Sequence, residues 1–315
     1  MNVEINDSVR SVVEYCLSIW GVDSNTENFL DKSTSWLTPV DQEQTDIFLK
    51  LLKSFNYYTR ERVMTAFREL KVEFEQTVPY HEYTLYLPMI SPKGRFNHSY
   101  DMISCYQTAN NLGKEYFGTE IQEVINNYPL DKIVNIVFLD DVIGTGKTIK
   151  NSLEHYRKYY SKLLDDKSIY VMTLEACESG IEFISNYSKE INNQIRILTC
   201  NRHQKAFSVG YIFEGEEATA ARNIIEGYEV KITNNKEDFI LGFNRSEALM
   251  AFFYDTPNNT LCIFWHDNTK MNWTALFPRK RPKKAPWAKD IGSKTKMQRN
   301  VNYNISKIVG ENSES

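Results

Sequence analysis

Cysteine is scarce in this sequence, and the cysteines that occur do not form a recognisable motif. The 315 residues include five cysteines, an odd number, with no Cys-x-x-Cys pair. A disulfide framework or a cysteine-rich zinc site requires paired, closely spaced cysteines. We therefore expect reduced, buried thiols in a cytoplasmic protein. The five are Cys16, Cys105, Cys177, Cys200 and Cys262.

Long hydrophobic runs are also absent. No stretch of about 18 apolar residues occurs, and the first residues lack a basic segment followed by a long apolar one. We expect neither secretion nor a membrane span, so the glycosylation sequons at Asn258 and Asn272 are interpreted as chance matches. The formal net charge of −4 is too small to indicate a strongly acidic or basic partner.

The residues that are present have the balance of a folded globular protein. Apolar residues make up 42% of the chain and charged residues 25%. A chain of this length allows one large or two ordinary domains with a sizeable core. Five histidines show no metal-binding spacing, and we interpret each as structural. They are His81, His98, His155, His203 and His266.

Helical periodicity dominates the first 80 residues. Apolar residues recur at helical spacing after Asp41 and again after Thr59, and each of these two residues is a plausible N-cap. The two predicted helices, joined by the sequence NYYT, could form a helix-turn-helix that reads nucleic acid. A plain helical hairpin is the commoner structure, and it is our prediction.

From residue 82 the pattern changes to short β-rich runs separated by predicted helices. The runs are YTLYLPM, KIVNIVFL, SIYVMTL and QIRILTC. Strands that alternate with helices form a parallel sheet. We predict an α/β fold with a parallel Rossmann-like sheet, an N-terminal helical region and a C-terminal cap. The predicted boundaries are 1–80 for the helical region, 81–230 for the core, 231–278 for the cap and 279–315 for a tail.

The predicted tail is strongly basic. Residues 278–299 carry nine Lys or Arg against one Asp, and three prolines interrupt them. Such a segment cannot bury enough apolar surface to fold alone. It could bind nucleic acid through phosphates, or it could simply be solvated, and both interpretations stay open.

The sequence IVFLDDVIGTGKT, residues 136–148, joins a buried-strand pattern to two acids and a glycine-rich loop. Ligands of open α/β sheets bind at the carboxyl ends of strands, where this strand delivers Asp140 and Asp141. Glycines let backbone N–H groups converge, and the next helix adds partial positive charge, so we predict a phosphate site. Its residues are Gly144, Thr145, Gly146, Lys147 and Thr148.

A nucleoside triphosphatase loop is the main alternative, and it does not fit. The pattern Gly-x-x-x-x-Gly-Lys-Ser/Thr would place a glycine at position 141, where this chain has Asp141. The later strand ends offer only Glu175 as a metal-binding acid.

The acidic pair followed by Thr-Gly-x-Thr resembles the ribose-phosphate motif of the type I phosphoribosyltransferases. In that family the acids contact the ribose hydroxyls, directly or through Mg²⁺, and the loop holds the 5'-phosphate. The resemblance implies that Asp140 and Asp141 are the catalytic and metal-binding residues and that Mg²⁺ is the cofactor. It also implies a phosphoribosyl or nucleotide ligand, with its phosphate on residues 144–148.

The same family has a pyrophosphate loop after the first core strand, and Lys93, Gly94 and Arg95 match it in position and chemistry. Two cations there would neutralise a departing diphosphate. The alternative is an ordinary Pro-Lys-Gly surface turn. Ser99 and Tyr100, which open the next predicted helix, could extend the site.

Two departures from the family bear on mechanism. Purine-salvage members carry an acid directly before Thr-Gly-Lys-Thr that accepts a proton from the nucleobase, but this chain has Gly144 there. The usual enzymes also insert a flexible β-hairpin that closes over the reaction. Here residues 110–132 are polar and helical in pattern, so exclusion of water by such a lid is in doubt.

Segments outside the core indicate which group of phosphoribosyltransferase-like proteins the chain resembles. The sequences LLKSFNYYT, TPNNTLCIFW and WTALFPR make residues 40–280 similar to phosphoribosyltransferase-like proteins of bacterial conflict and antiphage systems, including those paired with retron reverse transcriptases. Within them, Pro257 to Thr260 is predicted as a turn leading into an apolar strand. Its polar groups either face the substrate or only cap the turn, and we expect the latter.

Three functions follow from these patterns. The first, which we predict, is an antiphage effector enzyme acting at C1' of phosphoribosyl diphosphate or a nucleotide. The second is a nucleotide-binding sensor without turnover, which the missing proton acceptor and lid favour. The third is a partner subunit whose tail binds nucleic acid, for example beside a reverse transcriptase with its nucleic acid. No membrane partner is expected, and the oligomeric state stays open.

Overall fold

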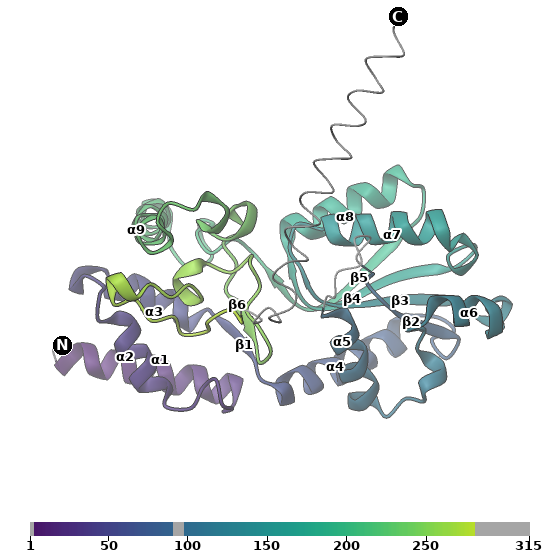
Figure 1. Cartoon of the computed structure of the whole chain (residues 1–315), viewed down its shortest axis with the longest axis horizontal. Coiled ribbons are helices and arrows are strands. Elements are labelled where there is room, and N and C mark those ends of the chain that lie inside the picture. The colour runs from purple at the N-terminus through teal and green to yellow at the C-terminus, as the bar shows by residue number, and fades with distance from the viewer. Residues whose placement is uncertain (1–2, 91–97, 281–315) are drawn as a thin grey trace, which may run out of the picture. The chain divides into compact units, whose positions relative to one another are not determined.

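The fold is built around a four-stranded parallel sheet with the strand order β2-β3-β4-β5 (Figure 1). The structure is a computed structural model that describes residues 3–90 and 98–280. The sheet and its covering helices confirm the predicted α/β class. The strands are β2 (Thr84–Pro88), β3 (Asn135–Ile143), β4 (Ser168–Cys177) and β5 (Ile195–His203).

Helices cover both faces of this sheet because successive strand residues point to opposite sides. In β3, Val137 and Leu139 belong to one hydrophobic cluster, and Ile136 and Phe138 belong to the other. The strand is therefore buried on both faces, as its sequence predicts. The first face is covered by α4 (Arg60–Thr77) and α5 (Ser99–Asn110), and the second by α6 (Ile121–Asn127), α7 (Lys147–Tyr159) and α8 (Glu178–Glu190).

The chain changes direction across the sheet between β2 and β3. From β2 it runs through α5 to Phe117, which forms a parallel bridge with Tyr86 on the free edge of β2. It then returns through α6 to β3. The helices that follow β2 and β3, α5 and α7, therefore lie on opposite faces of the sheet, and ligands of open α/β sheets bind at such a switch point.

The connection between α5 and β3 contains no β-hairpin in residues 111–134, all of which the structure describes. It consists of α6 and short 3-10 helices, which agrees with the predicted helical pattern. The 3-10 helices of the chain are η1 (Gln42–Gln44), η2 (Lys114–Tyr116), η3 (Leu130–Lys132), η4 (Ser161–Leu163), η5 (Glu237–Phe239), η6 (Phe243–Arg245), η7 (Cys262–Phe264) and η8 (Thr269–Met271).

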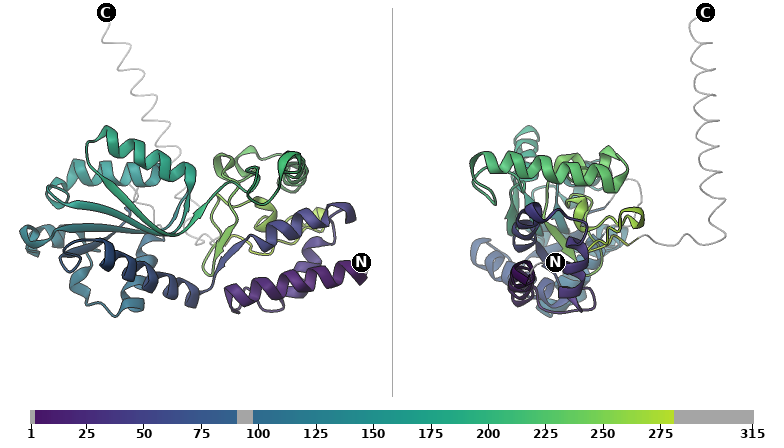
Figure 2. Two further views of the ribbon diagram at one scale, coloured as in Figure 1. Left: turned by 180° about the vertical axis from the view of Figure 1, so that it is seen from behind. Right: turned by 90° about the vertical axis from the view of Figure 1, so that its left-hand side faces the viewer.

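A second hydrophobic core joins segments from both ends of the described chain (Figure 2). Strand β1 (Asn56–Tyr58) pairs in parallel with β6 (Met250–Phe252). Trp36 is fully buried in this core, stacks on Phe264 and donates a hydrogen bond to the carbonyl of Ile263. The helices of this part are α1 (Val3–Trp20), α2 (Phe29–Leu37), α3 (Thr45–Lys53) and α9 (Gly215–Thr233).

The predicted helical hairpin is wrong, although both of its helices exist. The segment between α3 and α4 is strand β1 rather than a simple turn. Phe48 of α3 is buried in the second core, whereas Phe67 of α4 is buried against the sheet. Thr59 does cap α4 as predicted, because its side chain accepts a hydrogen bond from the Arg62 N–H.

The apolar strand predicted after Thr260 is also wrong, because residues Cys262–Phe264 form the 3-10 helix η7. The buried carboxylate of Glu229 in α9 accepts a hydrogen bond of 3.1 Å from the Ile263 N–H. A side chain, rather than a neighbouring strand, therefore satisfies the backbone there.

All five cysteines are free, and only Cys200 is more than slightly exposed. Across the described ranges, none of the helices combines the length and apolar character that crossing a bilayer demands. The predicted basic tail, apart from its first two residues, lies outside the described residues.

Candidate functional site

Strand β3 places two neighbouring carboxylates at the carboxyl end of the sheet. Asp140 is buried, and its Oδ1 accepts a hydrogen bond of 2.8 Å from the hydroxyl of Ser99 at the start of α5. Asp141 is half-buried, and its Oδ2 accepts one of 2.9 Å from the phenol of Tyr254. Both aspartates line a cavity of about 240 Å³.

The two carboxyl groups compete for ionisation. Burial raises the pKa of Asp140 well above its ordinary value, and the charge of Asp141 raises it further. Burial also raises the pKa of Asp141, while His98 and the Tyr254 hydroxyl act in the opposite direction. Adjacent carboxylates shielded from water are costly to ionise together, so the pair favours a proton or a cation beside it.

Aromatic residues missed by the sequence reasoning form one wall of this cavity. The ring of Tyr254 lies 4.5 Å from that of His98 and stacks on Phe252 of β6 at 5.3 Å between centroids. All three residues line the cavity. No sequence pattern indicates them, because neither a lone histidine nor the run FFYD after a short strand predicts proximity to a remote acidic pair.

The glycine-rich loop leads directly into helix α7. Gly146 precedes the first helical residue and has a φ of 74°, a left-handed conformation that favours glycine. The first turn of α7 contains no acidic side chain, and no side chain caps it. No side chain of the first turn therefore neutralises the partial positive charge at this helix end, and that charge can attract an anion.

The loop borders a second cavity, of about 180 Å³, that adjoins the first. Thr145 and Thr148 line it, and Thr148 also lines the cavity of the aspartates. The structure therefore brings the predicted acids and the predicted phosphate loop together. Gly144 and Gly146 line the loop cavity as well, whereas the exposed side chain of Lys147 lines neither cavity.

Helix α8 packs directly against this loop. A Cβ atom on Gly180 would lie 2.3 Å from the carbonyl oxygen of Gly144, so only glycine allows this approach. A Cβ on Gly146 would lie 2.8 Å from the ring of Phe183. The loop is thus held by backbone contact with the next helix.

The predicted pyrophosphate loop, Lys93, Gly94 and Arg95, lies outside the described residues. Its neighbours are described: Ser99 contacts Asp140, and Tyr100 is exposed.

The turn before η7 faces both cavities. The turn is closed by its own backbone, with the Thr260 N–H donating to the carbonyl of Pro257 at 3.2 Å. Asn258 and Asn259 line both cavities, and Arg279 lines the cavity of the aspartates. The expectation that the polar groups of this turn only cap it is therefore not supported, because the residues that carry them line the site.

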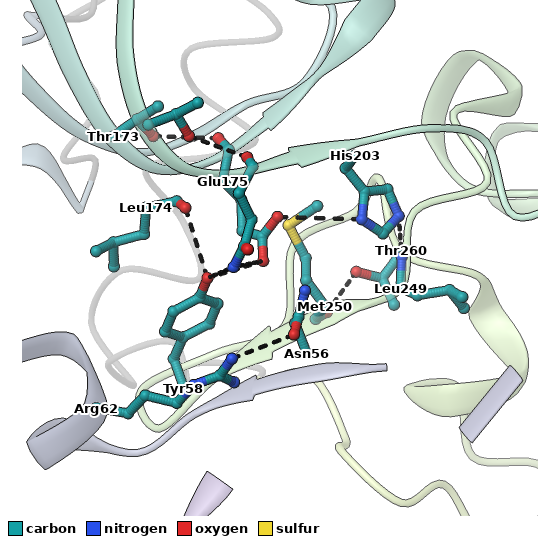
Figure 3. A network of polar contacts seen from close by, with 12 residues as sticks. Asn56, Tyr58, Arg62, Thr173, Leu174, Glu175, His203, Leu249, Met250 and Thr260 are labelled. Atoms are coloured by element: carbon teal, nitrogen blue, oxygen red, sulfur yellow. Dashed lines mark hydrogen bonds and ion pairs between the residues drawn. The ribbon is translucent and has the colours of Figure 1, made fainter. Parts of the chain in front are cut away.

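Glu175, the acid at a later strand end, belongs to a different cluster (Figure 3). Its Oε1 accepts hydrogen bonds from Tyr58 at 2.9 Å and from Asn201 at 3.3 Å. Nearby, Nε2 of His203 accepts one from the Leu249 N–H at 3.0 Å. Burial raises the pKa of Glu175 to about 7 and lowers that of His203 to about 4. This buried network joins the sheet to β1 and β6 and lines neither cavity.

The acidic pair fits the way proteins bind Mg²⁺ beside phosphates. Such sites use one or two carboxylates, with water and substrate oxygens completing the shell. Asp140 and Asp141 provide the two carboxylates next to the loop. In the described part of the chain, no three His, Cys, Asp or Glu side chains cluster as a complete protein cage would need.

A model of one protein family, described as PRTase-CE, matches residues 33–279, which is most of the chain. This chain belongs to the PRTase-CE family. The match spans the sheet, the loop and the cap of this PRTase-CE protein. The resemblance to phosphoribosyltransferases is thereby confirmed at the level of the family.

The fold of this PRTase-CE chain is also similar to that of solved structures. It is similar to the Helicobacter pylori xanthine-guanine-hypoxanthine phosphoribosyltransferase at 13% identity and a TM-score of 0.28. The similarity covers 47% of this chain and 89% of that one. None of the curated proteins matches the chain.

Proposed function

We propose that this PRTase-CE protein binds a ribose 5-phosphate compound, either phosphoribosyl diphosphate or a nucleotide, and acts at its C1' atom. The supporting observation is that the cavity of Asp140 and Asp141 adjoins the loop cavity at Thr148. The 5'-phosphate would bind along residues 144–148, and the ribose hydroxyls would face the two carboxylates.

The acids and their hydrogen-bond donors would have separate roles in the proposed reaction. Breaking the bond at C1' leaves an oxocarbenium-like ribose, whose positive charge Asp140 or Asp141 would stabilise. Ser99 and Tyr254 would orient these carboxylates through their hydrogen bonds. Bound Mg²⁺ would supply charge neutralisation at the departing anion. Lys93 and Arg95 are proposed to assist at a diphosphate.

The loop itself offers no proton acceptor, because residue 144 is glycine. A second function is therefore worth testing: a sensor that binds the nucleotide without turnover and gates a partner. The absence of a β-hairpin from residues 111–134 supports this alternative as well, since that segment would otherwise exclude water.

The biological role we propose is that of an antiphage effector in the cytoplasm. The resemblance of the segments outside the core to bacterial conflict proteins supports this role. A reverse transcriptase with its nucleic acid is the proposed partner, which the basic tail could contact through phosphates.

The test is an assay of the purified protein for release of diphosphate or nucleobase in the presence of MgCl₂. We expect turnover in the wild type and none in Asp140→Asn or Asp141→Asn. Asp165→Asn, an exposed position after η4, is the matched control and should behave as the wild type. Binding measured by calorimetry without turnover would select the sensor. If the protein neither binds the ligand nor turns it over, the proposal is contradicted.

A further inference from the structure

We infer that Asn259 of the cap is a ligand-binding residue that occupies the space of the side chain missing at Gly144. The inference rests on the proposed function, because it concerns the same ribose 5-phosphate site. It adds a residue that comes from outside the loop and has a different chemistry from an acid at position 144.

The two residues are in direct contact. A Cβ atom on Gly144 would lie 2.6 Å from Nδ2 and 2.8 Å from Oδ1 of Asn259. Non-bonded atoms do not approach so closely, so the carboxamide already fills the place that a larger residue 144 would need. Glycine at this position and asparagine at 259 are therefore a matched pair.

The backbone of Asn259 is fixed without help from its side chain. Its carbonyl accepts hydrogen bonds from the Ala248 N–H at 3.1 Å and the Ser246 hydroxyl at 2.8 Å. Gly242 lies against the same carbonyl, since a Cβ there would be 2.1 Å from the oxygen. The next residue, Thr260, is buried and donates to the carbonyl of Met250 at 2.6 Å.

The carboxamide of Asn259 remains available to a ligand. Within residues 3–90 and 98–280 the carboxamide has no hydrogen-bond partner. Asn259 lines both cavities, and its carboxamide lies beside Gly144 of the loop cavity. A carboxamide offers two N–H donors and an oxygen acceptor. Because it lies where the cavities of the loop and of the aspartates meet, its donors can reach ligand oxygens between the phosphate and ribose positions.

Charge explains why an amide suits this place. The cavity of the aspartates already contains Asp140, Asp141 and Asp255. A further carboxylate beside the loop would repel a phosphorylated ligand, whereas a neutral amide donates hydrogen bonds without that penalty. A carboxamide also does not titrate near neutral pH. We therefore assign it to phosphate or sugar oxygens rather than to proton transfer at a nucleobase.

The experiment is a double-mutant cycle that measures calorimetric affinity for ribose 5-phosphate in MgCl₂. Asn259→Ala should weaken binding about 10-fold, because a hydrogen bond to a charged group is lost. Asn259→Asp should weaken it further through repulsion. Gly144→Ala should weaken binding by collision with Asn259. Gly144→Ala combined with Asn259→Ala should bind like Asn259→Ala alone, since the collision is then gone.

Controls separate this inference from the function on which it rests. Asn126→Ala, an exposed position in α6, should bind as the wild type, and thermal unfolding should show that each variant is folded. If the wild type binds, Asp140→Asn does not, and Asn259→Ala binds normally, the role of Asn259 is refuted while the proposed site stands. Strictly additive effects in the cycle would also refute it. If the folded wild type does not bind ribose 5-phosphate, both proposals fail.

Discussion

The phenol of Tyr254 donates a hydrogen bond of 2.9 Å to Oδ2 of Asp141, although 113 positions separate the two residues. Strand β3 delivers the carboxylate, and the segment after β6 delivers its donor. The same division holds elsewhere in the site, where the loop after β3 meets Asn259 of the cap. The candidate site therefore combines segments that are remote in sequence.

Tyr254→Phe should weaken Mg²⁺-dependent binding of ribose 5-phosphate and move its pH dependence upward. The hydroxyl lowers the pKa of Asp141, so its loss raises that pKa, and a higher pH is then needed to ionise the carboxylate. The phenyl ring would keep its stacking on Phe252. Calorimetric titrations from pH 5 to 8 measure the shift.

A matched control for that variant is Tyr159→Phe, because Tyr159 is exposed and lines neither cavity. It should reproduce the wild-type pH dependence. An unshifted profile in Tyr254→Phe would show that the hydrogen bond to Asp141 does not control the site.

Asp140→Asn should make the metal-free protein more stable at neutral pH while it abolishes the proposed activity. The pKa of Asp140 is raised well above its ordinary 3.8, so the native state keeps this proton to a higher pH than the unfolded state does. Wild-type stability is therefore lost as pH rises above about 4, and the variant escapes this loss. Urea unfolding at pH 4 and pH 8 in EDTA should show a gain on the order of 1 kcal/mol only at pH 8. An equal gain at both pH values would contradict the assigned cause.

Gly180→Ala should disturb the loop from outside the ligand site. Its Cβ would lie 2.3 Å from the Gly144 carbonyl, so either the loop or helix α8 must move. We expect a loss of about 1–3 kcal/mol in unfolding free energy and weaker binding of ribose 5-phosphate. Gly227→Ala in α9, whose Cβ would meet no atom within 4 Å, is the control and should be tolerated. Normal binding by a folded Gly180→Ala protein would show that this contact does not set the loop.

Glu175→Gln and Glu229→Gln should have opposite effects at pH 8. Burial raises the pKa of both from 4.5 to about 7. Each group therefore lowers the unfolding free energy of the protein as pH rises from about 4.5 to about 7. Oε2 of Glu175 has no hydrogen-bond partner in the described structure, and an amide can replace it. Both oxygens of Glu229 accept hydrogen bonds from backbone N–H groups, those of Leu241 and Ile263. A glutamine there would place its NH₂ donor against one of these N–H donors.

Glu175→Gln should therefore gain about 1–3 kcal/mol at pH 8 and nothing at pH 4, while Glu229→Gln should lose a similar amount at pH 8. Urea unfolding at the two pH values measures both. Burial lowers the pKa of His203 to about 4, so this residue makes the unfolding free energy fall as pH falls. His203 is present in both variants and in the wild type, so it does not alter the comparison. Stabilisation by both substitutions would contradict the hydrogen-bond assignment.

The sheet and the loop could be predicted from sequence because their signals are local. Four apolar runs between helical patterns specify a parallel sheet, and the glycines of residues 144–146 sit where a strand turns into a helix. The proximity of the acids to the loop follows from chain continuity alone. The positions of Ser99 and Tyr254 are different, because each depends on how the chain crosses or leaves the sheet.

The second core shows the limit most clearly. Tyr57 and Tyr58 look like part of a turn between helices, yet they form a strand whose partner begins at Met250. Strand pairing between remote three-residue segments leaves no periodicity that a sequence can show. Residues 262–264 were wrongly predicted as a strand for a related reason. The buried Glu229 accepts the Ile263 N–H, and this bond replaces pairing with a neighbouring strand.

The most direct test of the site is an experimental structure of the protein with ribose 5-phosphate and Mg²⁺. We predict phosphate oxygens within hydrogen-bonding distance of the backbone N–H groups and hydroxyls of Thr145 to Thr148, with the ribose facing Asp140 and Asp141. A well-ordered ligand bound elsewhere, or a phosphate turned away from this loop, would contradict the account.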